Sequence, residues 1–301
     1  MKVLRPLTRS VTFCLGSALL ALGAHAGELE KIKASKSITI AHRDASIPFS
    51  YLDANKRPIG YAMDLCLKVA EAVKQELKLP ALEIKYLAVT SSSRIPAIVE
   101  GKASLECGST TNNAERRKQV DYTIPHFISS SRFLVRSDSR IEKLDDLAGR
   151  VVVSTKGTTN IKTLERLSTE RALGLKIEEA KDHNESFEAV SSKKADAFAM
   201  DDALLFGLRA NSPEPARFMV VGKPMTIEPY AIMLPKGDAA FKRVVDQELR
   251  RIMQSGEILP IYRKWFLSAI PPKGINLELP LSYMLKESFK FPSDKVGDLV
   301  D

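Results

Sequence analysis

The sequence predicts an α/β fold of two lobes, and three observations lead to this prediction. At 301 residues the chain is long for a single hydrophobic core, so two units of about 100 to 200 residues each are expected. Short apolar strands alternate along it with amphipathic helices, an order typical of α/β layers. In addition, β segments near residues 132–135 and 230–234 should carry the chain between the lobes, which suits hinge closure on a ligand.

The first lobe is predicted to begin with parallel strands and helices between residues 27 and 131. Leu65, Val69 and Val73 recur at every fourth position of residues 64–77, which gives a helix with one apolar face. The other elements expected in this part are strands over residues 37–41, 83–89 and 103–106 and helices over residues 93–101 and 115–119.

The second lobe is predicted over residues 132–229, and residues 230–301 then return to complete the first lobe. Each lobe is therefore expected to follow the same strand and helix alternation, with the first lobe discontinuous in sequence. The expected strands cover residues 133–135, 151–153, 176–180, 197–200 and 230–234, and the expected helices cover residues 160–173, 186–193, 241–253 and 258–266.

Residues 1–26 have the pattern of a secretory signal peptide. Three basic residues precede an apolar run over residues 11–23, and Ala24-His25-Ala26 forms a small-residue cleavage site. The alternative, a transmembrane anchor, needs roughly 20 apolar residues, more than this run provides. We therefore expect cleavage after Ala26 and a mature protein in the periplasm.

The composition is that of a soluble globular protein. Apolar residues make up 44% and charged residues 27% of the chain, with 45 Lys and Arg against 37 Asp and Glu. These values exclude a disordered polyelectrolyte, a collagen-like fibre and a multispanning membrane protein. The basic residues form no stripe interleaved with aromatic residues, so a nucleic-acid partner is not expected.

The three cysteines divide between the leader and the mature chain. Cys14 lies in the apolar run of the expected signal peptide, whereas Cys66 and Cys107 remain after cleavage. In an oxidising compartment two thiols can form a disulfide. Spacing alone does not give the distance between them, so a disulfide and two separate buried thiols are both open at this point.

No catalytic template is present. The chain lacks a G-x-S-x-G nucleophile elbow, and its four histidines are scattered without zinc-ligand spacing to a cysteine. The segment Gly157-Thr158-Thr159 lacks the second glycine and the Gly-Lys-Ser/Thr end of a phosphate loop. We therefore predict no catalytic residue, no metal and no cofactor.

The candidate binding residues lie in loops that follow predicted strands, where open α/β sheets bind ligands. These loops are rich in hydroxyl and cationic side chains and have few carboxylates. Such a set favours a small anionic or zwitterionic molecule. Its members are His42, Arg43, Asp44, Thr90, Ser91, Arg94, Ser109, Thr110, Thr111, Arg116, Thr158, Thr159, His183, Asp201 and Asp202.

Six segments carry a resemblance to a known family. They are HRDASIPFSY (42–51), TSSSRIPAIVEGK (90–102), CGSTTNNAERRKQ (107–119), AKDHNESF (180–187), MDDALL (200–205) and YRKWFLSAIPPK (262–273). With them the chain resembles the glutamate/aspartate-binding proteins of polar amino-acid ABC importers, in solute-binding protein family 3. The resemblance implies a periplasmic-binding-protein type II fold, with two α/β lobes, two hinge crossovers and a ligand in the cleft. It also implies a monomer that delivers L-glutamate or L-aspartate to a membrane permease.

The resemblance implies a role for each binding residue. Arg116 would bind the ligand α-carboxylate, with Ser109 and Thr111 beside it, and Asp201 would bind the α-ammonium. Arg117 is expected to face solvent and Asp202 to cap the following helix. The ligand side-chain carboxylate would be met by Arg43, Ser91, Arg94, Thr159 and His183. One departure is that Ser93 stands before Arg94 where the family has Asn.

The charges of this set favour an acidic ligand. Arg116 and Asp201 match the two charges of any free amino acid, since a guanidinium pairs with a carboxylate and a carboxylate with an ammonium. Arg43 and Arg94, with help from His183, add a positive subsite that a neutral side chain would leave unpaired. Glutamate and aspartate differ by one methylene, worth about 1 kcal/mol, so both are expected to bind.

Two alternatives share this cleft. A periplasmic cyclohexadienyl dehydratase would use it for an anionic substrate, with Glu106 or His183 as the acid. A ligand-reading subunit of a sensor kinase would use the same pocket with a different partner.

Overall fold

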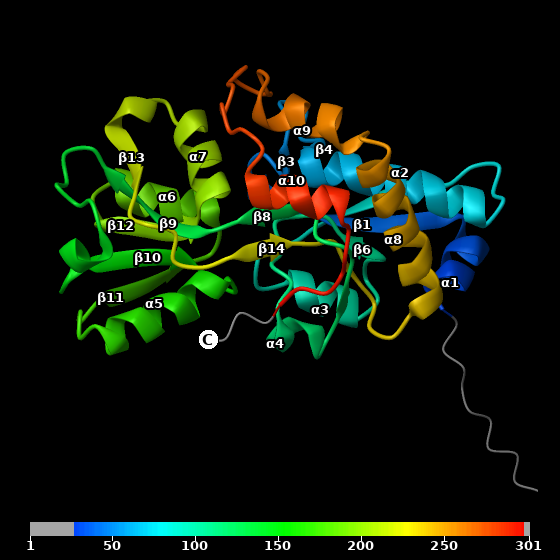
Figure 1. Cartoon of the computed structure of the whole chain (residues 1–301), viewed down its shortest axis with the longest axis horizontal. Coiled ribbons are helices and arrows are strands. Elements are labelled where there is room, and N and C mark those ends of the chain that lie inside the picture. The colour runs from blue at the N-terminus through cyan, green and yellow to red at the C-terminus, as the bar shows by residue number, and fades with distance from the viewer. Residues whose placement is uncertain (1–26, 298–301) are drawn as a thin grey trace, which may run out of the picture.

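The computed structural model describes residues 27–297, so the predicted signal peptide, with Cys14, lies outside the described residues. Two five-stranded sheets, each flanked by helices, form two lobes side by side (Figure 1). This arrangement confirms the predicted α/β class. Within residues 27–297, no helix has the length and apolar character needed to cross a membrane.

The first sheet has the strand order β5-β1-β6-β15-β7. The interior strand β1 (Ser37–His42) pairs in parallel with β5 (Glu83–Ala88) and β6 (Leu105–Glu106) and is buried along most of its length, as expected for an apolar strand covered on both faces. Antiparallel to β6, β15 (Met233–Leu234) follows it in the sheet, and β7 (Asp121–Tyr122) forms the edge opposite β5.

Helices cover this sheet with the faces that the sequence periodicity predicts. In α2 (Tyr61–Glu76), Leu65, Val69 and Val73 are all fully buried. The other helices of this lobe are α1 (Glu28–Ser35), α3 (Arg94–Val99), α4 (Ala114–Arg117), α8 (Ala239–Gln254), α9 (Ile258–Phe266) and α10 (Tyr283–Lys290).

The second sheet has the order β11-β10-β12-β9-β13. Its strands β11 (Lys176–Ala180), β10 (Val151–Thr155) and β12 (Ala197–Asp201) are parallel, so their carboxyl ends share one edge. The strands β9 (Ser131–Arg136) and β13 (Phe218–Val221) are antiparallel to each other. The helices of this lobe are α5 (Thr159–Glu170), α6 (His183–Ser191) and α7 (Asp202–Asn211).

The strands that cross between the lobes are not the ones predicted. Residues 132–135 lie inside β9 of the second sheet, and β15 lies inside the first. The crossing pair is β8 (Phe127–Ser129) with β14 (Glu228–Tyr230), antiparallel and visible between the lobes in Figure 1. The sequence showed the longer apolar runs next to the crossovers, whereas strands of three residues carry too little periodicity to be recognised.

Aromatic side chains fix both crossing strands to the first lobe. The ring of Phe49 lies 4.8 Å from that of Phe127 on β8 and 5.1 Å from that of Tyr230 on β14, measured between centroids. Phe127 also stacks on Phe266 of α9 at 5.1 Å. All four rings are buried. Any bending of the crossovers is therefore expected on their second-lobe side, away from this cluster.

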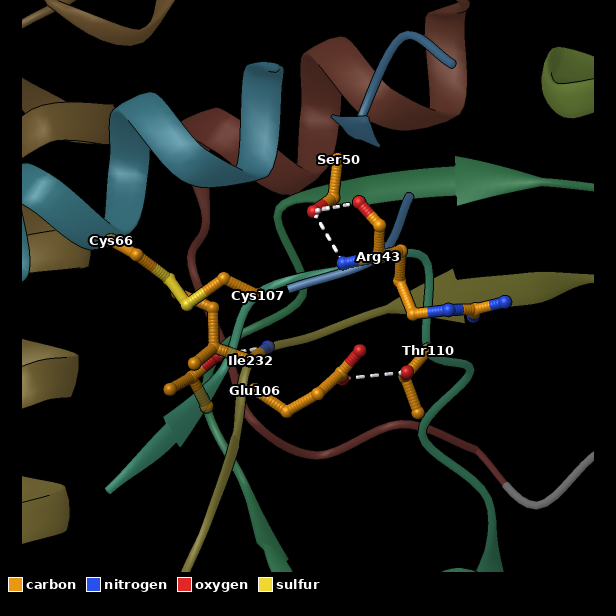
Figure 2. Close-up of a disulfide and its surroundings, with 8 residues drawn as sticks. Arg43, Ser50, Cys66, Glu106, Cys107, Thr110 and Ile232 are labelled. Carbon is orange, nitrogen blue, oxygen red and sulfur yellow. Dashed lines mark hydrogen bonds between the residues drawn. A yellow bond between two sulfur atoms is a disulfide. The ribbon is translucent and has the colours of Figure 1, made fainter. Parts of the chain in front are cut away.

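Cys66 and Cys107 form a disulfide, which decides between the two alternatives left by the sequence (Figure 2). Cys66 belongs to the buried face of α2, and Cys107 directly follows β6, with 6.3 Å between the Cα atoms. The bond therefore joins the main helix of the first lobe to the start of the 108–113 loop.

Replacing both cysteines by alanine is expected to lower the free energy of unfolding by about 2–4 kcal/mol, because the bond closes a loop spanning 41 positions in the unfolded chain. Urea unfolding of the double variant and of the oxidised parent protein measures the difference. An unchanged midpoint would contradict the bond.

Candidate ligand-binding site

A cavity lies between the two lobes, where the carboxyl ends of both sets of parallel strands meet. Eight of the nine predicted binding residues line it, and Arg43 is the exception. Its lining consists of Ser91, Arg94, Ser109, Thr111, Arg116, Thr158, Thr159, His183, Met200, Asp201 and Leu204.

A short helix positions Arg116. The side chain of Asn113 caps α4 by accepting a hydrogen bond from the Arg116 backbone N–H at 3.0 Å. The guanidinium then turns back over the loop, and its Nη1 donates to the Thr111 carbonyl at 2.9 Å. Arg117 lies half-buried beside Asn112, whose side-chain oxygen accepts from its Nη1 at 2.9 Å. Only Arg116 of the two lines the cavity.

Arg94 begins α3 and is 2% exposed. Its Nη1 donates to the Thr110 hydroxyl at 2.6 Å, and its Nε has no hydrogen-bond partner. Burial, followed by the like charge of Arg116, lowers the pKa of Arg94 to about 9, so the group remains cationic near neutral pH. Two buried guanidiniums that repel each other form a site that a bound anion stabilises.

Arg43 lies behind the cavity wall rather than in it. It is 2% exposed, and one of its terminal nitrogens has no hydrogen-bond partner. Burial lowers its pKa, and the charge of Glu106 opposes that shift. Both side chains extend toward the Thr110 loop, where the Thr110 hydroxyl donates to Glu106 at 2.7 Å (Figure 2). Arg43 therefore adds positive potential from behind the described lining, and its direct contact with a ligand stays a prediction.

His183 lines the cavity in a neutral form. Burial lowers its pKa well below the usual value, and the charges of Arg43 and Arg94 add to that shift. Its Nδ1 lies 2.8 Å from the Thr155 hydroxyl. The expected contribution of His183 to the positive charge is therefore wrong, because two nearby guanidiniums oppose a third cation. A neutral imidazole can still donate one hydrogen bond into the cavity.

Asp201 is the only acidic side chain in the described lining and ends β12 at the start of α7. The side-chain amide of Asn160 donates to Asp201 at 2.9 Å, and the Tyr230 hydroxyl donates to its other oxygen. Burial, and next the charge of Glu228, raises the pKa of Asp201 to about 7. A cation placed beside this carboxyl would relieve both effects.

Asp202 points away from the cavity, toward the crossover. Its carboxylate accepts hydrogen bonds from the hydroxyls of Ser129 at 2.7 Å and Ser130 at 2.8 Å. It also accepts from the Ala203 backbone N–H at 2.7 Å. The adjacent aspartates thus have different tasks, and Asp202 ties the first turn of α7 to the end of β8.

Direct contacts between the lobes narrow the cleft. The Gly157 carbonyl, in the loop after β10, accepts from Arg116 at 3.2 Å and from Arg94 at 3.5 Å. Gly157 has φ +80°, and a Cβ atom there would lie 2.8 Å from the Ser91 carbonyl oxygen. A larger residue would therefore hold the lobes apart.

Several residues at or next to the cavity were not predicted from the sequence. Met200 and Leu204 line the cavity from the end of a strand and the first turn of a helix, outside the loops considered. Asn160, Glu228 and Tyr230 act on the lining through hydrogen bonds, and no local spacing reveals such pairings. Among residues 27–297, no group of three His, Cys, Asp or Glu side chains is placed to hold a metal ion.

Two α/β lobes, two crossing strands and a polar cavity between them define a two-lobed binding protein for a small solute. Residues 38–268 match the bacterial extracellular solute-binding proteins, family 3, and the chain belongs to this family. The predicted family and its class, a solute-binding protein and not an enzyme, are thereby confirmed.

Characterised relatives span nearly the whole chain. The L-glutamate/L-aspartate-binding protein of Pseudomonas aeruginosa is 47% identical over 97% of this chain and 97% of its own. The glutamate/aspartate import solute-binding proteins of Salmonella typhimurium and Escherichia coli are 40% and 38% identical, covering 93% and 98% of this chain and 97% and 99% of their own.

Solved structures support the fold. An ancestral arginine-binding protein bound to glutamine has a TM-score of 0.69 and 24% identity, and it covers 77% of this chain and 98% of its own. The cysteine-binding protein from Campylobacter jejuni has a TM-score of 0.68 and 23% identity, with 79% and 92% covered.

Proposed function

We propose that this protein binds L-glutamate and L-aspartate in the interlobe cavity and delivers them to the membrane permease of an ABC importer. The observation that carries the proposal is the charge of the cleft. Arg94 and Arg116 line it, Arg43 lies behind it, and Asp201 is the acidic member of the described lining. The names of the relatives described above state that these proteins bind or import the same two amino acids.

Each charged group of the ligand meets a group of opposite charge in this proposal. Arg116 takes the α-carboxylate and Asp201 the α-ammonium, which leaves Arg94, with Arg43 behind it, for the side-chain carboxylate. The unpartnered Nε of Arg94 and the unpartnered hydroxyls of Ser91 and Ser109 provide polar groups for the ligand oxygens. A neutral side chain would leave the extra guanidiniums uncompensated.

The proposed site of action is the periplasm, after removal of residues 1–26. The disulfide supports an oxidising compartment, and the family consists of extracellular solute-binding proteins. We propose that residues 27–131 with 230–301 and residues 132–229 move as two bodies around the crossing strands. The protein would act as a monomer.

The dehydratase alternative has less support at this site. Glu106, one of its candidate acids, accepts from Thr110 and is absent from the described lining. His183, the other, is neutral and its Nδ1 is paired with Thr155.

Isothermal titration calorimetry tests the proposal directly. The protein, unfolded and refolded to remove any bound solute, is titrated with L-glutamate, L-aspartate and L-histidine at pH 7.5. We expect micromolar dissociation constants for the two acidic amino acids, about −8 kcal/mol, and much weaker binding of histidine. The absence of heat with both acidic ligands would overturn the proposal.

Arg94→Met is expected to weaken L-glutamate about a hundredfold while leaving the weak binding of L-glutamine nearly unchanged. The variant removes a buried cation that only the acidic side chain needs. Titration of both ligands measures the two changes. Arg166→Met, which breaks an exposed ion pair on α5, is the control. Equal losses for both ligands would contradict the role given to Arg94.

A further inference from the structure

Glu228 connects both walls of the cleft from the crossing strand β14. One oxygen of its carboxylate, Oε2, accepts the hydroxyl of Thr111 at 2.6 Å and the hydroxyl of Thr159 at 3.0 Å. Thr111 follows β6 of the first lobe, and Thr159 begins α5 of the second. Glu228 is 3% exposed and is not part of the described lining, whereas both threonines are.

These two bonds determine whether each hydroxyl acts as a hydrogen-bond donor or as an acceptor toward the ligand. A threonine hydroxyl has one proton to donate and two lone pairs that accept. A carboxylate only accepts hydrogen bonds, so the hydroxyls of Thr111 and Thr159 each donate their one proton to Glu228. What they offer the cavity is then acceptor lone pairs, which suit an ammonium group and repel a carboxylate.

The neighbouring charges agree with this polarity. Asp201 lines the same cavity, and the charge of Glu228 contributes to its raised pKa, so the two carboxyls act on one another. Asp201 and the two threonines belong to the described lining, and Glu228 accepts from both threonine hydroxyls. The guanidiniums of Arg94 and Arg116 supply the opposite charge.

We propose that Glu228 is a positioning residue that sets the ammonium end of the cleft, by turning the hydroxyls of Thr111 and Thr159 into acceptors beside Asp201. It thereby makes the protein reject dicarboxylic acids that lack an amino group. The role expected for Thr159, donation to the ligand side-chain carboxylate, changes accordingly. The inference rests on the proposed function and specifies the group that the site recognises.

A pair of ligands isolates this effect. L-Glutamate and glutarate have the same carbon chain and the same two carboxylates, and they differ in the α-ammonium. The ratio of their dissociation constants therefore measures recognition of the ammonium alone. A loss of fold or of lobe closure weakens both ligands and leaves the ratio unchanged.

The test measures this ratio by calorimetric titration for the parent protein and for Glu228→Gln, Thr159→Val and Asp202→Asn. We expect the parent protein to prefer glutamate by at least a hundredfold. Glu228→Gln, which removes the charge and can donate a proton to a threonine oxygen, should reduce the preference at least tenfold. Thr159→Val should reduce it severalfold. Asp202→Asn changes a neighbouring carboxylate that faces the crossover, and it should leave the preference for glutamate over glutarate unchanged.

The outcomes test the inference about Glu228 and the proposed function separately. If Glu228→Gln and Thr159→Val weaken glutamate and glutarate by the same factor, the inference is overturned, because the hydroxyls then donate to a carboxylate or serve only the fold. If the parent protein binds neither glutamate nor aspartate, the proposed function itself fails. A second variant, Thr111→Val, repeats the test should Glu228→Gln not fold.

Discussion

Arg116→Ala is expected to abolish the binding of every amino acid, with an affinity loss of at least a hundredfold. The guanidinium is the proposed partner of the α-carboxylate, which all free amino acids share. Its position is fixed by the capped α4 helix and by the bond to the Thr111 carbonyl. Removing one partner of a buried charge pair costs about 3–5 kcal/mol, which corresponds to more than a hundredfold. Calorimetric titration with L-glutamate measures the loss.

The neighbouring arginine provides the control. Arg117→Ala removes the same side chain one position later, where the guanidinium contacts Asn112 outside the described lining. Its affinity for L-glutamate should stay within about threefold of the parent value. Comparable losses in the two variants would show that the helix as a whole matters, and would contradict the specific role of Arg116.

Binding of L-glutamate is expected to weaken as the pH falls from 8 to 6, and Asp201→Asn should remove both that dependence and most of the affinity. The pKa of Asp201 is raised to about 7 by burial and by Glu228, so the carboxyl gains a proton below pH 7. The ligand ammonium needs the ionised form, and the dissociation constant should therefore rise up to tenfold per pH unit below 7. The dissociation constant should be lowest near pH 8, where Asp201 is ionised and Arg94, with a pKa of about 9, is still cationic.

Titrations of L-glutamate between pH 5.5 and 8.5 measure this profile for three proteins. Asp202→Asn should keep the parent profile because its carboxylate binds Ser129 and Ser130 away from the cavity. Asp201→Asn should bind at least a hundredfold more weakly at pH 8, with a flat profile. A parent affinity that is constant from pH 8 to pH 6 would contradict the account of Asp201.

Most of the main elements could be predicted because they have a clear period. The apolar positions of α2 and the buried strand β1 can be recognised from their residue types, and both elements lie where they were predicted. The crossing strands were misplaced by a few residues. They have only three residues each, and their burial comes from aromatic partners such as Phe49 and Phe266, which are distant in sequence.

The cavity lining could also be predicted in large part, since strand-end loops contain it. Two features could not. Arg43 follows a strand as the pattern requires, but its side chain turns behind the wall toward Glu106, which depends on the packing of Gly108. Glu228 reaches Thr111 and Thr159 only because the crossing strand brings it there from far along the chain.

The ratio of affinities for L-glutamate and L-glutamine tests the central claim most directly. The two ligands are nearly identical in shape, and they differ in the side-chain charge that Arg43 and Arg94 are proposed to balance. Measured by calorimetry at one pH and one salt concentration, glutamate should bind at least a hundredfold more tightly. Equal affinities, or tighter binding of glutamine, would contradict the claim that the positive charge of the cleft selects the ligand.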